Sequence, residues 1–257
     1  MTANGGRCLV PDSSILTGMQ NIINEALGLK KERLKYKDKK RCQLWSKPPT
    51  PDFSGEELIQ KILDQINANW DGRKSRSNNQ NWRWKKNPLK KNRNNKSQEV
   101  FLERLIVGTT DDDWVNQVPV ASGLTRSAGG RRAIDLVHRC GNNWYELIEL
   151  KVDEGGGTPL FAAMEILQYG VLYIFSRENA QSLGYKETNN ELLGASGIHL
   201  KVLAPAAYYK KYDLSWLEVR INNGLANFLE EPNRGFKMDF KFESLSLVPS
   251  GSRVQWG

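Results

Sequence analysis

Two short segments in the middle of the chain are almost continuously hydrophobic, which predicts a pair of buried β-strands. They span residues 132–137 and 144–152 and are rich in β-branched, aliphatic and aromatic side chains. Gly141, Asn142 and Asn143 tolerate left-handed backbone geometry, so we expect an antiparallel hairpin. Because side chains alternate between the faces of a strand, Glu149 and Lys151 should project together beside buried neighbours.

The segments around this hairpin predict an α/β domain. Their hydrophobic periodicity indicates helices at 98–107, 159–177 and 215–230, and strands at 117–124, 198–203 and 236–248. The helix at 98–107 should turn one apolar side to the core, formed by Val100, Phe101, Leu105 and Ile106. The same helix carries Glu99 and Glu103, four residues apart on one face.

The first 72 residues predict a mostly helical extension. Helices are expected at 13–29 and 55–69, and Ser54 with Glu57 three residues later forms a capping box for the second. A proline-rich stretch at 47–51 connects them stiffly. We therefore expect a helical extension at 1–72, a basic linker or nucleic-acid-binding segment at 73–96, and the α/β domain at 97–250.

Positive charge is concentrated in the basic segment at 73–96. The chain has a net charge of +8, and this segment holds ten Lys or Arg residues and no acid, so the remainder is close to neutral. A localised basic stripe attracts phosphate backbones through counterion release. The segment reads as irregular or disordered, and Trp82 and Trp84 within it either stack on bases or dock onto the folded domain, docking being favoured.

Asp135 and Glu149 suit the chemistry of a metal-dependent phosphodiester hydrolysis. Mg²⁺ prefers oxygen ligands and keeps several waters, so two carboxylates and one backbone carbonyl, that of Leu150, suffice to hold it. Lys151 would then orient or deprotonate the attacking water, or stabilise charge on the phosphate. The structural alternative is a surface salt bridge between Glu149 and Lys151, worth roughly 0–1 kcal/mol.

These elements, in this order, resemble the PD-(D/E)xK nuclease superfamily, also called the restriction-endonuclease-like fold. The resemblance covers residues 98–177 and implies a central mixed β-sheet flanked by helices. It also implies that Asp135 and Glu149 bind Mg²⁺, with Mn²⁺ as a substitute, that Lys151 is the catalytic lysine, and that Glu99 or Glu103 is an auxiliary acid.

Two departures from the superfamily pattern stand out. Ala133-Ile134 replaces the proline of its name, and Gln168 and Tyr169 are adjacent where some branches space a Gln and a Tyr as QxxxY. Dimerisation is common in the superfamily, so a homodimer is among the expected assemblies.

The leading hypothesis is a Mg²⁺-dependent nuclease that acts on DNA in restriction, repair or defence. The alternatives are an RNA-directed nuclease and a non-catalytic nucleic-acid-binding protein on the same fold. The candidate nucleic-acid contacts are Arg83, Lys85, Lys86, Lys90, Lys91, Arg126, Arg131, Arg132 and Gln168.

Other features argue against competing classes of protein. Cys8, Cys42 and Cys140 have neither disulfide-framework nor zinc-site spacing, so we expect three reduced thiols. We expect no apolar run long enough for a membrane span and see no signal-peptide pattern, which favours a cytoplasmic protein without a membrane partner. His138 is expected to be structural, and His199 has no partner that the sequence identifies.

Overall fold

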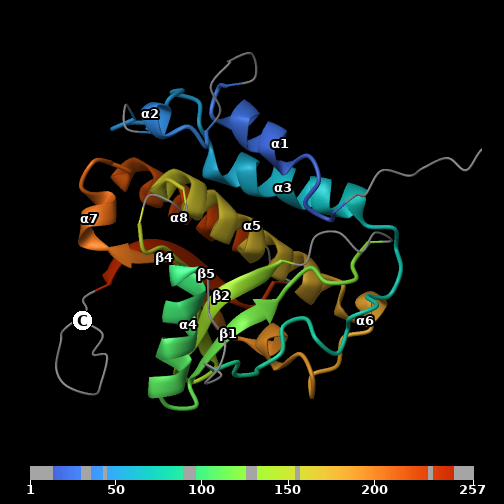
Figure 1. Ribbon diagram of the computed structural model, residues 1–257. Helices are drawn as coiled ribbons and strands as arrows, with labels where there is room; N and C mark the ends of the chain where they lie inside the picture. Colours follow the sequence, from blue (N-terminus) through green and yellow to red (C-terminus); the bar gives the residue numbers. More distant parts are fainter. Residues whose placement is uncertain are drawn as a thin grey trace, which may run out of the picture.

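A five-stranded mixed sheet flanked by helices forms the centre of the molecule (Figure 1). The computed structural model describes residues 14–29, 36–42, 45–88, 97–125, 132–153, 157–230 and 234–245. The strands are β1 Trp114–Pro119, β2 Ala133–Gly141, β3 Trp144–Leu150, β4 Gly197–Pro205 and β5 Lys237–Leu245. They lie in sequence order across the sheet; β1, β2 and β3 pair antiparallel, whereas β4 and β5 add parallel to β3. The predicted α/β class is confirmed.

The predicted hairpin is confirmed as β2 and β3. Leu136 lies opposite Ile148 and His138 opposite Glu146. Strand β2 runs to Gly141, further than the sequence predicted, so the turn narrows to Asn142 and Asn143. Asn143 takes the left-handed backbone (φ 62°), as expected of asparagine in a tight turn.

Helices α5 Pro159–Glu178 and α8 Ser215–Leu229 cover one face of the sheet. The Thr158 hydroxyl caps α5 by accepting a hydrogen bond from the Phe161 N–H at 3.1 Å. Contrary to the sequence expectation, α5 is long and apolar enough by composition to span a membrane. However, 83% of its most apolar window is buried in the protein. That burial is typical of a helix packed on a sheet.

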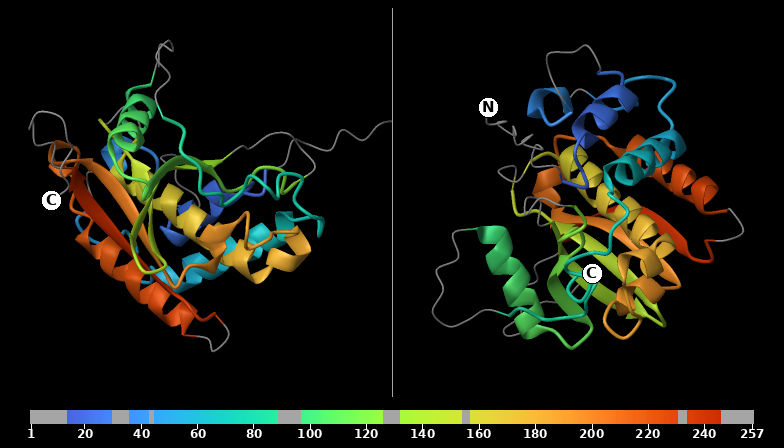
Figure 2. Two further views of the ribbon diagram at one scale, coloured as in Figure 1. Left: turned by 90° about the horizontal axis from the view of Figure 1, so that it is seen from below. Right: turned by 90° about the vertical axis from the view of Figure 1, so that its right-hand side faces the viewer.

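Helix α4 Gln98–Thr109 lies on the other face, as Figure 2 shows in green. Its buried side is Glu103, Ile106 and Val107. The expectation that Phe101 faces the core is wrong, because α4 packs through a narrow side and leaves Phe101 48% exposed. Beneath α4 lies a small apolar cluster that includes Leu136.

The N-terminal helices stack on the layer formed by α5 and α8. Helix α3 Gly55–Asn69 packs on both, and α1 Met19–Ala26 packs on α3 (Figure 1). Helix α3 has its predicted bounds, and the Ser54 hydroxyl caps it as predicted by accepting from the Glu57 N–H at 3.2 Å. The predicted helix at 13–29 is shorter, because Gly18 adopts a left-handed φ of 88° at its start. Among the described residues there are four further short helices: α2 Lys39–Cys42, α6 Ala180–Leu183, η2 Glu191–Gly194 and α7 Ala206–Tyr209.

The strand predicted at 117–124 lies earlier, at 114–119. Gly123 takes a left-handed φ of 71°, and a Cβ there would come within 2.9 Å of the Ser77 backbone nitrogen. The chain therefore turns at this glycine instead of continuing the strand. Val120 still donates its N–H to the Arg132 carbonyl at 2.9 Å, one residue beyond the strand.

Both edges of the sheet are covered by other parts of the chain. Along β1, the Trp82 N–H donates to the Pro119 carbonyl at 2.8 Å, and the Asn87 N–H donates to Asn116 Oδ1 at 2.9 Å. Along β5, Asn222 of α8 accepts from the Phe240 N–H at 2.7 Å and donates to its carbonyl at 2.9 Å. The Pro119 carbonyl on β1, and the N–H and carbonyl of Phe240 on β5, are thereby occupied and do not pair with another strand.

Candidate functional site

The hairpin brings Asp135, Glu149 and Lys151 together at one end of the sheet. Lys151 Nζ lies 2.6 Å from Glu149 Oε1, and both residues are buried, with 5% and 4% of their surface exposed. The register that places Leu136 opposite Ile148 carries on to set Asp135 beside Glu149. A surface salt bridge is excluded, because the pair is inside the protein.

Asp135 is held by the backbone of the second strand. The Leu150 N–H donates to Asp135 Oδ2 at 2.9 Å, so the contact that Leu150 makes with this aspartate is through its N–H. Burial raises the pKa of Asp135 to about 6, although Lys151 and the Leu150 N–H act to lower it. The Asp135 carboxylate therefore takes up a proton at a higher pH than an exposed aspartate does.

Glu149 and Lys151 have pKa values shifted in the same direction. Burial raises the pKa of Glu149 well above its ordinary value, and Asp135 and Glu165 add repulsion that Lys151 only partly offsets. Burial acts to lower the pKa of Lys151, but the nearby Glu149, Asp135 and Glu165 outweigh it and raise that pKa above its ordinary value. Lys151 therefore stays protonated, which favours charge stabilisation over proton abstraction as its role.

Helix α4 adds the acids that the sequence placed on one face. Glu103 is 1% exposed, and its Oε2 accepts a hydrogen bond from Gln117 Nε2 at 2.5 Å. Burial, together with repulsion from Asp135, raises the pKa of Glu103 to about 8. Glu99 is half-buried and adds repulsion to both Asp135 and Glu103, and its Oε1 has no hydrogen-bond partner among the described residues. Glu103 is thus the more buried of the two.

Glu165 on α5 is a further acid that the sequence analysis did not select. It raises the pKa of Asp135 and of Glu149, accepts a hydrogen bond from the Tyr169 hydroxyl at 3.3 Å, and lies 3.7 Å from Arg132. Its signal in the sequence was its position as a lone acid among the apolar residues of the first turns of α5. We call Asp135, Glu149, Lys151, Glu103 and Glu165 the acidic cluster.

The remaining candidate contacts divide into three groups. Arg132 lies beside the acidic cluster, whereas Gln168 bonds its own helix, donating from Nε2 to the Met164 carbonyl at 2.8 Å. Arg83 and Lys85 are exposed, but Lys86 donates to the Asp111 carbonyl at 2.7 Å and pairs with Asp112. Four candidates lie outside the described residues: Lys90, Lys91, Arg126 and Arg131.

The described part of the basic segment is docked on the domain, as favoured from its tryptophans. Trp82 is fully buried and meets the Tyr173 ring edge-on at 5.5 Å. Trp84 donates from Nε1 to the Asp112 carbonyl at 3.2 Å and lies under the Arg139 guanidinium at 4.6 Å. This docking leaves basic side chains such as Arg83 and Lys85 pointing to solvent along the β1 edge.

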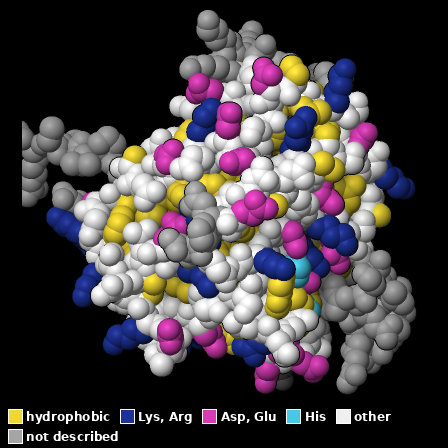
Figure 3. All heavy atoms as spheres, turned by 180° about the vertical axis from the view of Figure 1, so that it is seen from behind, with side chains coloured by type: hydrophobic (Ala, Val, Ile, Leu, Met, Phe, Trp, Pro, Cys, Tyr) yellow, Lys and Arg dark blue, Asp and Glu magenta, His cyan; other side chains and the backbone are white. Residues whose placement is uncertain are grey.

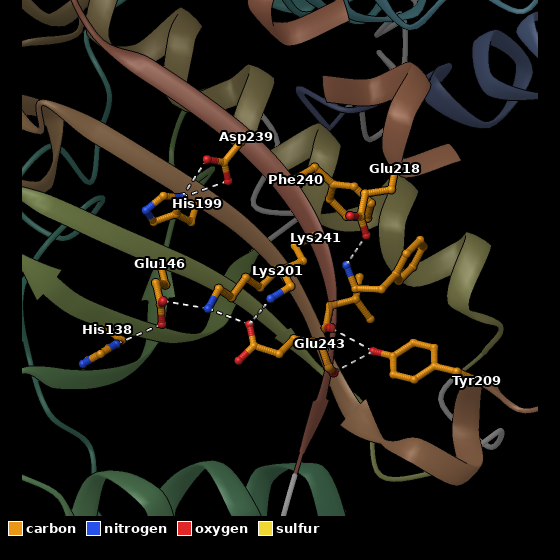
Figure 4. Close-up of polar contacts among 12 residues, drawn as sticks. His138, Glu146, His199, Lys201, Tyr209, Glu218, Asp239, Phe240, Lys241 and Glu243 are labelled. Atoms are coloured by element: carbon orange, nitrogen blue, oxygen red, sulfur yellow. Dashed lines mark hydrogen bonds and ion pairs between the residues drawn. The ribbon is translucent and has the colours of Figure 1, made fainter. Parts of the chain in front are cut away.

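A second charged group lies on the face of the sheet opposite to Glu149 and Lys151 (Figure 4). Lys201 bridges Glu146 and Glu243 at 2.7 Å each, His138 Nδ1 contacts Glu146 at 2.9 Å, and His199 Nδ1 contacts Asp239 at 2.8 Å. Figure 3 shows histidine at the surface, with side chains of both charges around it. We call these residues, His138, Glu146, His199, Lys201, Asp239 and Glu243, the bridged cluster.

Direct partners stabilise the ionised Glu146 in the bridged cluster. Burial would raise the pKa of Glu146, but hydrogen bonds from His138 and Lys201 outweigh it and lower that pKa to about 2. His138 stacks on Trp114 at 4.1 Å, and His199 stacks on Trp144 at 5.0 Å. The expectation that His138 is structural agrees with these contacts, and Asp239 is the partner of His199 that the sequence did not identify.

Cys42 is buried and Cys140 is exposed, and both are free thiols; Cys8 lies outside the described residues. Among the parts of the chain that the structure describes, no three Asp, Glu, His or Cys side chains are close enough to hold one metal ion by themselves. Any ion at the acidic cluster must therefore take ligands from backbone carbonyls or water as well. No protein-family model, curated protein or solved structure matches the chain.

Proposed function

We propose that the protein is a metal-dependent nuclease that hydrolyses phosphodiester bonds of DNA. The observation that carries the proposal is the acidic cluster at the end of the sheet, where the carboxylates of Asp135, Glu149 and Glu165 act on one lysine, Lys151. Glu103 adds a fourth carboxylate, which repels Asp135. Fully ionised, these groups leave an excess of negative charge that water does not solvate. A divalent cation at this position would balance it.

The order of elements supports a restriction-endonuclease-like core. Helix α4 precedes three antiparallel strands, α5 follows them, and β4 then adds parallel to β3. Asp135 lies on the second of these strands and Glu149 with Lys151 at the end of the third, as the resemblance implies. This agreement in topology and position favours the superfamily over a chance match of three residues.

The donor set fits Mg²⁺, with Mn²⁺ as a substitute. Both are hard cations that bind carboxylate, carbonyl and water oxygens, and Mg²⁺ commonly uses one or two carboxylates. Asp135 and Glu149 would hold the ion, with the Leu150 carbonyl as a third oxygen and Glu103 or Glu99 as an auxiliary acid. Burial and repulsion from neighbouring acids raise the pKa values of Asp135 and Glu103, and a bound cation would favour the ionised form of both.

When bound, the metal would lower the pKa of a coordinated water and neutralise charge on the phosphate. The hydrolysis adds the water oxygen to phosphorus and breaks one P–O ester bond, and the leaving oxygen takes a proton. Lys151, held protonated by its acidic neighbours, stabilises the negative charge that develops on the phosphate oxygens. Burial of the cluster strengthens that interaction, because bulk water does not screen it.

The basic segment would hold the nucleic-acid backbone. Arg83 and Lys85 are exposed along the β1 edge, next to the strand that carries Asp135. Lys86 has a structural role instead, because the carbonyls of Thr110 and Asp111 accept its N–H groups. Non-specific backbone contacts of this kind account for affinity without sequence preference.

The test compares the protein with its Lys151→Ala variant on single- and double-stranded DNA and RNA, with Mg²⁺, Mn²⁺ or a chelator. We expect cleavage of DNA that requires metal and is lost in the variant. Equal cleavage by both proteins would refute the role of Lys151. Binding without cleavage under every metal would favour a non-catalytic binding protein, and cleavage confined to RNA would favour the RNA-directed alternative.

A further inference from the structure

A cavity of about 230 Å³ opens beside the acidic cluster. Glu165 and Tyr169 of α5 and Arg132 before β2 line one side, and Tyr36 and Lys37 of the N-terminal extension line the other. Glu165 belongs to both places, because it raises the pKa of Asp135 and Glu149 within the cluster. The cavity and the cluster are therefore neighbours that share one carboxylate.

The N-terminal wall of this cavity is fixed by the fold. Asn24 is buried, and its Oδ1 accepts the Tyr36 N–H at 3.0 Å. Asn69 of α3 donates from Nδ2 to the carbonyls of Ile15 at 2.9 Å and Thr17 at 2.8 Å. The start of α1 and Tyr36 are thus held in place over α5.

The lining combines cations with aromatic rings. The Tyr36 and Phe161 rings are nearly parallel, with centroids 6.2 Å apart, and Lys37 Nζ lies 4.8 Å from the centre of the Phe161 ring. Lys37 is exposed, and the Arg132 side chain is 48% exposed while lying 3.7 Å from Glu165. Cationic groups bind phosphate oxygens and flat rings contact bases or sugars, a combination that single-strand-binding sites use.

We propose that this cavity receives one unpaired nucleotide of the cut strand, so that the substrate is a single strand or an unpaired end. This inference rests on the proposed nuclease function of the acidic cluster. The cavity is smaller than the roughly 300–1,000 Å³ of typical ligand pockets, which leaves room for part of one strand and none for a base pair. Because Glu149 and Lys151 are almost fully buried, a phosphate must leave the duplex surface to reach them.

The N-terminal extension is then a specificity element. Arg132 and Lys37 bind the phosphate of the unpaired nucleotide, and the half-buried Phe161 ring, backed by Tyr36, lies beside its base or sugar. Gln168 also lines the cavity, and its amide oxygen can accept a hydrogen bond while its nitrogen stays on Met164. A paired strand meets the same wall and is excluded by its size.

Binding without cleavage tests the cavity. Fluorescence anisotropy in chelator would compare a labelled single-stranded oligonucleotide with the same sequence as a blunt duplex, for the protein and for Lys37→Gln and Lys61→Gln. Lys61 is an exposed lysine on α3 and serves as the matched control for loss of one charge. We expect the single strand to bind more tightly than the duplex. Lys37→Gln should lower the affinity for the single strand about five- to tenfold, and Lys61→Gln should leave that affinity unchanged.

Preference for the blunt duplex, or equal single-strand binding by Lys37→Gln and the unaltered protein, would overturn the cavity assignment. A cleavage assay with Mg²⁺ on blunt and overhanging ends separates this inference from the proposed function. Equal cleavage of both ends overturns the inference and leaves the nuclease intact. Absence of cleavage, with single-strand binding that depends on Lys37, overturns the nuclease and supports the cavity as a binding site.

Discussion

Strand β3 carries two glutamates whose environments are opposite. Glu146 faces the bridged cluster, where Lys201 and His138 lower its pKa to about 2. Glu149, three residues later on the other face, lies in the acidic cluster, where burial and its acidic neighbours raise its pKa well above the ordinary value. The same residue type on one strand is therefore stabilised as an ion in one place and destabilised in the other.

The difference lies in the local balance of charge. Glu146 has two direct cationic or hydrogen-bonding partners, and Lys201 also contacts Glu243. Among the described residues, Glu149 has one such partner, Lys151, which is shared electrostatically with Asp135 and Glu165. Direct cationic and hydrogen-bonding partners stabilise an ionised carboxylate within a fold, whereas buried acids that share one cation cost free energy and are retained where they bind an ion.

The largest expected effect is on cleavage. Asp135→Asn keeps an oxygen for the Leu150 N–H but loses the charge that holds a cation, so activity should fall on the order of 10³-fold or more. Glu146→Gln removes a similar charge from the bridged cluster and should leave activity within a few-fold. Initial rates of DNA cleavage with Mg²⁺ measure the activity of both variants, once circular dichroism shows that they are folded like the unaltered protein. Similar losses of activity in the two variants would contradict the different roles assigned to the two clusters.

The next effect is on stability. Lys201→Met leaves Glu146 and Glu243 without their shared cation, and we expect a loss of about 2–3 kcal/mol in the free energy of unfolding. Urea denaturation at pH 7 measures it. A variant as stable as the unaltered protein would show that the bridged cluster contributes nothing to the fold.

A smaller effect concerns the dependence of stability on pH. Glu103 has a pKa of about 8 in the folded protein against 4.5 ordinarily, so the folded state binds its proton more tightly and stability falls as pH rises between these values. Glu103→Gln cannot ionise and should be more stable at pH 9, by on the order of 2 kcal/mol, and little different at pH 4. Denaturation in metal-free buffer across this pH range measures the difference in the free energy of unfolding. If that free energy changed with pH in the same way in both proteins, the raised pKa of Glu103 would be contradicted.

In the bridged cluster, stability depends on pH with the opposite sign. Glu146 has a folded pKa of about 2, below its ordinary 4.5, so it contributes stability above pH 4.5 that is lost as pH falls toward 2. Glu146→Gln should therefore be less stable than the unaltered protein at pH 7 and approach it at pH 2. A denaturation series extended down to pH 2 shows whether Glu103 and Glu146 change stability with pH in opposite directions.

The smallest effect is on affinity for nucleic acid. Changing Arg83 and Lys85 together to Gln should weaken DNA binding a few-fold and lower the slope of log affinity against log salt by about 1–2. Lys86→Gln should lower stability instead, because its N–H groups hold the carbonyls before β1. An unchanged salt slope in the double variant would place the backbone contact elsewhere.

The hairpin and its acids were predictable because each signal was local. Alternating faces set Glu149 beside Lys151, and the helical spacing of Glu99 and Glu103 set both acids on α4. Arg132 and Gln168, which we propose contact the single strand, were already candidates from the sequence. Their position around one cavity could not be predicted from it.

What the sequence did not predict depends on contacts between distant segments. Glu165 meets Asp135 only because α5 crosses back over the sheet, and Tyr36 lines the cavity only because α1 stacks on α3. The bridged cluster needs the parallel register that sets Glu146 beside His199 and His199 beside Asp239. Phe101 was misplaced for a related reason: the side of α4 that packs on the sheet is narrower than its apolar side.

Cation binding tests the contrast between the two clusters most directly. Calorimetric titration of Mn²⁺ at pH 8, with Mg²⁺ as competitor, would compare the protein with Asp135→Asn and Glu146→Gln. We predict one site in the protein, the same affinity in Glu146→Gln, and loss of binding in Asp135→Asn. Absence of binding to the unaltered protein, or equal affinity in Asp135→Asn, would contradict the assignment of the acidic cluster as a metal site.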